Sequence, residues 1–228
     1  MGKLAVVGLG LIGGSMALDL KKRLKYQVYG IDKNPEHIKS ALKLGIIDKE
    51  ADFSDLKDVE IVIVAVPVNH IAEVSQKVLD NISDEALVLD VGSVKNNICE
   101  ALKKHPKRQN FVAAHPLAGT EFSGPEAAIE NLFDEKVTII CESEKTNWKT
   151  LDKAISLFKK LNMRIKMMNP VEHDRHVAYV SHLSHVSSFM LGKTVLEIEK
   201  NEQAIFLSLI HISEPTRRRG IGGCGVWV

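Results

Sequence analysis

Short apolar runs alternate along the chain with longer stretches in which apolar residues recur every three or four positions. The runs predict β-strands at LAVV, YQVYGID, VEIVIVAVP, ALVLDVGS, NFVAAHP, KVTIICE and RIKMM. The intervening stretches, such as HIAEVSQKVLDNI and WKTLDKAISLFKKL, predict amphipathic helices. Continuously apolar strands that alternate with helices are typical of a mostly parallel sheet covered on both faces. We therefore predict a doubly wound α/β domain over residues 1–168.

The pattern changes after residue 168. Residues 169–210 contain no apolar β run and keep helical spacing, which predicts the start of an all-helical domain. About 40 residues are too few to form a stable core alone, so we expect this domain to be incomplete. The final stretch, HISEPTRRRGIGGCGVWV, has no periodicity and resembles translated cloning sequence. We expect residues 211–228 to be a non-native tail that follows a truncated helical domain.

Composition narrows the class of protein. The chain has 228 residues and a formal net charge of +1, and its basic residues are spread along the sequence, which disfavours nucleic acid and anionic membranes as partners. Its 3 cysteines form no CxxC pair, so they indicate neither a disulfide framework nor a zinc site and favour a reducing cytoplasm. The apolar runs are far shorter than the roughly 20 residues of a membrane span.

A glycine motif joins the first predicted strand to the first predicted helix. Gly8, Gly10 and Gly13 form G-x-G-x-x-G, with Leu11 and Ile12 inside it. In this motif the first glycine permits the turn, the second admits a pyrophosphate and the third allows close packing of helix and strand. The N–H groups at the start of the helix then bind the phosphates. We therefore predict a Rossmann-type dinucleotide site at these residues.

Asp32 ends the second predicted strand, about twenty residues after the motif, where an acidic residue binds the adenosine ribose. A carboxylate there accepts hydrogen bonds from the ribose hydroxyls and repels the 2′-phosphate of NADP, so NAD is favoured over NADP. Lys33 follows directly and would soften that repulsion. An alternative role for Asp32 is to cap the helix that begins near Pro35.

Ligands of a doubly wound sheet bind beyond the carboxyl ends of its strands, so the residues that follow each predicted strand are candidates. Val66 and Pro67 are predicted to contact the cofactor. Ser93 lies at the next such position, although it is also placed to cap a helix that starts at Val94. His115 follows an apolar run and precedes a proline, so its imidazole is predicted to face the crevice.

Two pairs of histidines have helical spacing: His173 with His176, and His182 with His185. Imidazoles three positions apart are able to share a zinc ion. No HExxH pattern, third carboxylate or cysteine partner accompanies them, so we predict no metal site and favour substrate binding or helix packing.

Together, GLGLIGGS, AVPV, DVGSVK, HPLAGTE and EHDRHVAYVSHLSH resemble the prephenate/arogenate dehydrogenase family of tyrosine biosynthesis, over about residues 1–209. The resemblance implies NAD(P)-dependent oxidative decarboxylation of prephenate to 4-hydroxyphenylpyruvate, or of arogenate to tyrosine. It implies that His115 binds the ring hydroxyl and takes its proton as hydride departs, while Ser93 orients that hydroxyl and the nicotinamide. By the same similarity the substrate pocket is lined by Thr120, Glu121, His182 and His185.

The resemblance also implies a longer helical domain that supplies an arginine for the substrate carboxylate and most of a homodimer interface. We therefore expect this chain to bind NAD weakly and to turn over little prephenate, and its full-length parent to be active. Two alternatives stay open. A β-hydroxyacid dehydrogenase would need a lysine on the first long helix after the sheet, and none lies between His173 and Phe189. An NAD-sensing module would leave Ser93 and His115 without a task.

Overall fold

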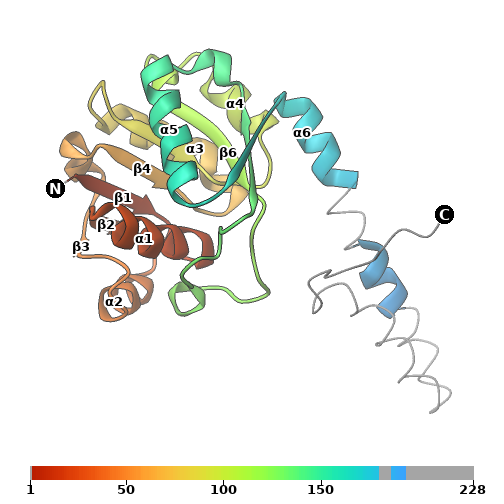
Figure 1. Ribbon diagram of the computed structural model, residues 1–228, viewed down its shortest axis with the longest axis horizontal. Coiled ribbons are helices and arrows are strands. Elements are labelled where there is room, and N and C mark those ends of the chain that lie inside the picture. Colours follow the sequence, from red (N-terminus) through yellow and green to blue (C-terminus); the bar gives the residue numbers. More distant parts are fainter. Residues whose placement is uncertain (1, 180–185, 194–228) are drawn as a thin grey trace, which may run out of the picture. The chain divides into compact units, whose positions relative to one another are not determined.

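The computed structural model describes residues 2–179 and 186–193, shown in Figure 1. The chain divides into two compact units, Met1–Arg175 and His176–Val228. Unit 1 contains the whole sheet, and residues 186–193 of unit 2 are helical. The predicted roles of His182, His185 and the tail at 211–228 lie outside the described residues. Among the residues that are described, no helix has the length and apolar character needed to cross a bilayer.

A sheet of 8 strands forms the centre of unit 1, in the order β3-β2-β1-β4-β5-β6-β7-β8. All neighbouring strands are parallel except β6 and β7, which confirms the prediction of a mostly parallel, doubly wound sheet. Only β3 was not predicted, because its 2 residues are too few to leave a pattern. The strands are β1 (Lys3–Val7), β2 (Gln27–Ile31), β3 (Lys49–Glu50), β4 (Ile61–Val64), β5 (Leu87–Asp90), β6 (Phe111–Pro116), β7 (Val137–Cys141) and β8 (Arg164–Met168).

Helices cover both faces of the sheet, because side chains of each strand alternate between two hydrophobic layers. Val6 of β1 packs in the layer under α1, α2 and α5, whereas Val7 packs in the layer under α3 and α4 (Figure 1). The helices are α1 (Leu11–Leu24), α2 (Pro35–Lys43), α3 (Val68–Asn81), α4 (Asn96–Leu102), α5 (Trp148–Lys160) and α6 (Pro170–Val177). Short 3₁₀ turns lie at η1 (Phe53–Asp58), η2 (Arg108–Asn110), η3 (Pro125–Ala127) and η4 (Ser143–Lys145).

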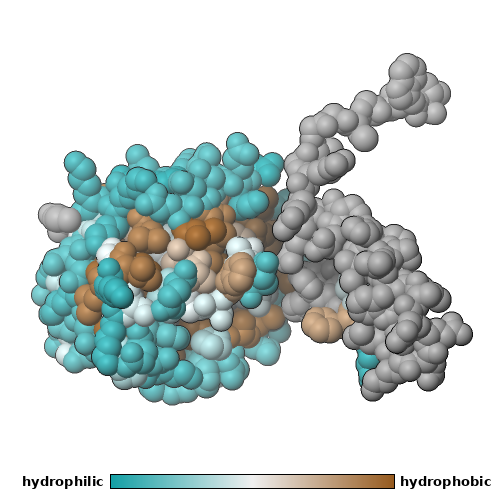
Figure 2. All heavy atoms as spheres, turned by 90° about the horizontal axis from the view of Figure 1, so that it is seen from below, coloured by the Kyte–Doolittle hydropathy of each residue, from teal (hydrophilic) through white to brown (hydrophobic). Residues whose placement is uncertain are grey.

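A long connection, residues 117–136, joins β6 to the antiparallel strand β7 and packs on α1. Ser15 Oγ accepts a hydrogen bond from the backbone N–H of Ile129, and Asp19 Oδ1 accepts one from that of Asn131. The connection also exposes apolar side chains such as Phe122, and Figure 2 shows hydrophobic surface open to solvent on one face of the molecule. Helix α1 therefore supports both the glycine turn that precedes it and the segment that follows β6.

Asp19 is buried at this contact, and its Oδ2 atom has no hydrogen-bond partner among the described residues. Burial raises the pKa of the Asp19 carboxyl, and the Asn131 N–H and the charge of Arg23 offset this only partly. A carboxyl whose pKa is higher in the folded than in the unfolded state stabilises the fold at low pH. That contribution disappears as pH rises through the folded pKa.

We therefore predict that Asp19→Asn raises the free energy of unfolding at pH 7, on the order of 1 kcal/mol for each unit of pKa shift. The gain should vanish below about pH 4, where the unfolded carboxyl is itself protonated. Urea unfolding, monitored by circular dichroism between about pH 4 and pH 7, measures the gain and its disappearance at low pH. Asp152→Asn, at an exposed position, is the control. A gain that does not change with pH would contradict the explanation.

Candidate functional site

The carboxyl ends of β1, β2, β4, β5 and β6 lie along one edge of the sheet, because these strands are parallel. The order of the strands reverses between β1 and β4, since β2 and β3 lie on one side of β1 and the later strands lie on the other. A crevice at such a reversal is where α/β sheets bind ligands. Most of the predicted site residues of unit 1 lie at or after the carboxyl ends of these strands.

The glycine turn follows β1 directly at the reversal. Gly8 has a φ of +96° and donates its N–H to the carbonyl of Ile31, which brings the turn against the end of β2. A Cβ at Gly13 would lie 2.1 Å from the carbonyl oxygen of Gly8. The first and third glycines are therefore required by the fold itself, whatever the turn binds.

Gly10 differs from these two, because a Cβ at this position would meet nothing within 4 Å. It immediately precedes α1, whose first turn carries no acidic residue, and no described side chain caps it. The side chains of Leu11 and Ile12 pack in or against the hydrophobic layer under α1. The open space over Gly10 thus faces uncapped backbone N–H groups and the positive end of a helix dipole, which suits an anionic group such as a phosphate.

Asp32 lies next to this turn, at the end of β2. Its Oδ2 accepts a hydrogen bond of 2.8 Å from the N–H of Leu9, and its Oδ1 accepts one of 2.8 Å from the N–H of Asn34. The alternative role of Asp32 as a helix cap is wrong, because Asn34 caps α2 through the N–H of Glu36. An ionised carboxylate has about four acceptor sites, so Asp32 retains capacity for ribose hydroxyls.

Three other residues that we predict to contact the cofactor follow the carboxyl ends of β2 and β4 within a few positions of the sequence. Lys33 is exposed and follows Asp32. Val66 follows β4 and packs against the hydrophobic layer under α3, and Pro67 is exposed immediately before that helix. These placements are compatible with a cofactor lying along the edge.

Ser93 lies in the turn between β5 and α4 and is half-buried. The predicted capping by Ser93 is wrong, because α4 begins at Asn96 and not at Val94. A carboxylate from α6 takes the capping position: Asp174 accepts hydrogen bonds from the N–H groups of Lys95, at 2.7 Å, and Asn96, at 2.9 Å. Sequence reasoning missed this contact because Asp174 is 79 positions away from Lys95.

A buried ion pair joins two residues that flank Ser93 in the sequence. Lys95 Nζ pairs with the Asp90 carboxylate, and both side chains are 0% exposed. Lys95 Nζ also donates to the carbonyl of Ala114 at 2.7 Å, and Asp90 Oδ1 accepts from the N–H of Ala114 at 3.2 Å. The pair therefore joins the turn that carries Ser93 to the strand residue that precedes His115.

His115 is half-buried near the end of β6, as the apolar run before it predicts. Its Nδ1 lies 2.9 Å from Nε2 of His173, and the two rings meet edge to face at an interplanar angle of 76°. His173 is fully buried, and its Nδ1 lies 2.7 Å from Asp174 Oδ1. The helical spacing associated His173 with His176, which is exposed, so the sequence did not reveal its contact with His115.

The predicted substrate-binding residues of unit 1 lie on the segment after β6. Thr120 and Glu121 are exposed there, and Thr120 Oγ1 accepts a hydrogen bond from the N–H of Phe122. Their role stays a prediction, as do those of His182 and His185. Within residues 2–179 and 186–193, no three His, Cys, Asp or Glu side chains are grouped so that they could hold a metal ion.

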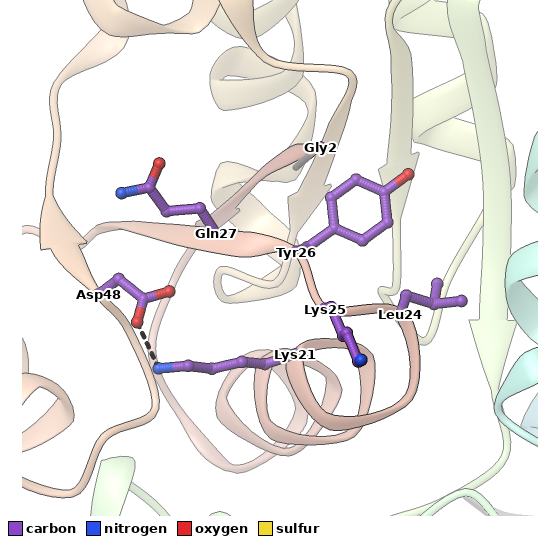
Figure 3. Close-up of a pocket in the computed structure, with 7 residues that line it drawn as sticks. All are labelled: Gly2, Lys21, Leu24, Lys25, Tyr26, Gln27 and Asp48. Carbon is purple, nitrogen blue, oxygen red and sulfur yellow. Dashed lines mark ion pairs between the residues drawn. The ribbon is translucent and has the colours of Figure 1, made fainter.

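A separate hollow of about 810 Å³ opens at the opposite edge of the sheet, near the amino ends of β1 and β2 (Figure 3). Lys21 and Asp48 face each other across it in an ion pair of 2.6 Å, and Asp48 also accepts from the N–H of Val28. It is lined by Gly2, Lys21, Leu24, Lys25, Tyr26, Gln27 and Asp48. Its position away from the carboxyl ends, with these charges paired, makes it a weaker candidate than the edge with Ser93 and His115.

The contribution of the buried ion pair between Lys95 and Asp90 to the stability of the fold can be tested by mutation. We predict that Lys95→Met lowers the free energy of unfolding by about 3–5 kcal/mol, because it leaves the Asp90 carboxylate buried without its cation. Adding Asp90→Asn should recover part of this loss, since the uncompensated charge is then gone. The exposed pair of Lys103 and Glu100 supplies a control, Lys103→Met, with a cost below about 1 kcal/mol. Equal losses for both lysine variants in urea unfolding would contradict this account.

Comparison with known proteins gives consistent results over most of the chain. Residues 16–167 match the family model for the nucleotide-binding domain of prephenate dehydrogenase, and residues 169–209 match that for its dimerization domain. Prephenate dehydrogenase of Bacillus subtilis is 38% identical over 186 residues, which cover 79% of this chain and 50% of that protein. The chain thus spans about half the length of this relative.

Solved structures agree with the sequence matches. The prephenate dehydrogenase of A. aeolicus, crystallised with hydroxyphenyl propionate and NAD+, superimposes with a TM-score of 0.82 and 32% identity, over 95% of this chain and 80% of that one. Synechocystis arogenate dehydrogenase gives a TM-score of 0.75 and 31% identity, over 92% and 74% of the two chains. On the family-model match and the identity to its relatives, the chain belongs to the prephenate dehydrogenase family.

Proposed function

We propose that the protein carries out NAD-dependent oxidative decarboxylation of prephenate to 4-hydroxyphenylpyruvate, with arogenate to tyrosine as the second candidate. The observation that carries the proposal is the position of Ser93 and His115 at the same carboxyl edge of the sheet as the glycine turn, in a chain of this family. The names of relatives that act on prephenate and arogenate support both substrates.

The residues at the reversal of strand order fit NAD. The open space over Gly10 and the N–H groups that begin α1 suit the pyrophosphate, and Asp32 suits the adenosine ribose. We assign the cofactor contacts to Gly8, Gly10, Leu11, Ile12, Gly13, Asp32, Lys33, Val66, Pro67 and Ser93. NAD, when bound, supplies the hydride acceptor, and the protein supplies position and proton transfer.

His115 is the proposed general base, because an imidazole titrates near neutral pH. It takes the proton of the ring hydroxyl as hydride leaves the carbon that bears this hydroxyl. Loss of the ring carboxylate as carbon dioxide then makes the ring aromatic, and His115 returns the proton to the oxygen, so no net proton is released. Ser93 orients the hydroxyl by a hydrogen bond.

We infer further that residues 169–210 begin a helical domain for substrate binding and homodimer formation, and that residues 211–228 are a non-native tail. The match of residues 169–209 to a dimerization domain supports the first inference. Substrate contacts are assigned to Thr120, Glu121, His182 and His185. Cys99 and Cys141 are buried free thiols, which is consistent with the proposed cytoplasmic location.

The reaction is tested by His115→Asn in a protein that carries a complete helical domain. We predict a loss of about 10²–10⁴-fold in NAD reduction with prephenate, the usual contribution of a general base, with NAD affinity unchanged. His105→Asn is the matched control, because His105 pairs with Asp80 beyond the far end of α4. If the complete protein binds NAD but oxidises neither prephenate nor arogenate, the proposal fails, and the hydroxyacid dehydrogenase or NAD-sensing alternative replaces it.

The cofactor site is tested by two alanine substitutions in the same turn. Gly10→Ala should leave the melting temperature unchanged, because its Cβ enters open space, and should weaken NAD binding at least about tenfold by blocking the phosphate. Gly13→Ala should lower the melting temperature, because its Cβ would collide with the Gly8 carbonyl. Thermal denaturation and titration with NADH fluorescence measure the two effects. Full NAD affinity in Gly10→Ala would contradict the assignment.

A further inference from the structure

Three side chains from two distant segments form a continuous hydrogen-bonded series at the site. It runs from His115 Nδ1 to His173 Nε2 at 2.9 Å, and from His173 Nδ1 to Asp174 Oδ1 at 2.7 Å. His173 is 0% exposed, and both of its ring nitrogens have a partner. A neutral imidazole has one donor and one acceptor nitrogen, so the partner at one end of the series determines the proton positions along it.

Asp174 determines which group donates and which accepts in each of these two hydrogen bonds. Burial alone would raise the pKa of its carboxyl, but hydrogen bonds from the Asn96 N–H, from His173 and from the Lys95 N–H outweigh burial and hold this pKa below its usual value. The ionised carboxylate only accepts hydrogen bonds, so His173 Nδ1 donates to it. His173 Nε2 then has the lone pair and accepts a hydrogen bond from His115 Nδ1.

We propose that His173 and Asp174 are positioning residues that keep the catalytic His115 in the tautomer with its proton on Nδ1 and its lone pair on Nε2. This inference rests on the base role proposed for His115. The arrangement also serves the protonated state, because an imidazolium at His115 keeps its Nδ1–H bonded to His173, whose other nitrogen contacts a carboxylate. The same logic, with one imidazole fewer, operates in serine protease triads.

The position of the carboxylate is itself fixed by the fold. Asp174 accepts the first free N–H groups of α4, from Lys95 and Asn96, so it cannot rotate away from His173 without leaving these amides buried and unpaired. Three neighbouring titratable groups among the described residues add no unpaired charge. Asp90 and Lys95 pair with each other, and Cys141 stays neutral because burial raises the pKa of its thiol to about 12.

The tautomer is measured directly by NMR of nitrogen-labelled histidine, because protonated and unprotonated ring nitrogens have well separated chemical shifts. We expect the chain as it stands to show His115 protonated on Nδ1 at neutral pH. Asp174→Asn should convert this into a mixture of tautomers, and the control His105→Gln should leave it unchanged. His115 protonated on Nε2, or the same tautomer in Asp174→Asn, would overturn the inference. The experiment needs neither NAD nor turnover, so its failure is distinct from failure of the proposed reaction.

Kinetics of the protein with a complete helical domain provide the second test. Asp174→Asn should lower kcat at least about tenfold with little change in KM, and it should move the acid limb of the kcat/KM profile to lower pH, because a negative charge that favours imidazolium is lost. His173→Gln, which keeps a polar side chain, should show the same shift and covers the case that Asp174→Asn fails to fold. An acid limb unchanged in every folded variant would show a merely structural role and overturn the inference.

Discussion

The buried ion pair between Lys95 and Asp90 is the interaction on which the arrangement of the site depends. Neither side chain reaches solvent, so the cost of removing two charges from water is met only while both partners and their backbone hydrogen bonds stay in place. Ser93 lies between the two partners in the sequence, and Ala114, which contacts both of them, precedes His115. A cation–carboxylate contact therefore links the end of β5 and the turn that follows it to β6.

The remainder of the site follows from the direction of the strands. Parallel strands place their carboxyl ends together, and the order of the strands reverses between β1 and β4, where α/β sheets bind their ligands. Gly8 and Gly13 pack closely against neighbouring backbone, whereas Gly10 borders open space. One short turn thus meets two separate demands, close packing on one side and access for an anionic ligand on the other.

Sequence reasoning predicted the features that depend on local pattern. The strands appear as apolar runs, the glycine turn has its own spacing, and a histidine at the end of such a run must lie at the ligand-binding edge. The contacts of Asp174 and His173 have no such pattern, since each joins residues far apart in the chain. The predicted start of α4 at Val94 was wrong for the same reason. The helix is capped by the Asp174 carboxylate of α6 and not by the hydroxyl of Ser93.

Helix α1 supports the segment after β6 through Ser15 and Asp19, which bind the backbone at Ile129 and Asn131. Thr120 and Glu121 lie earlier on that segment, away from these anchors. The anchoring residues and the proposed substrate contacts therefore lie on different parts of this connection. On the proposed assignment of Thr120 and Glu121 to the substrate, substitutions among residues 117–124 change recognition while the anchored residues keep the connection on the same helix. Substrate preference then diverges in evolution without rebuilding α1 or the glycine turn.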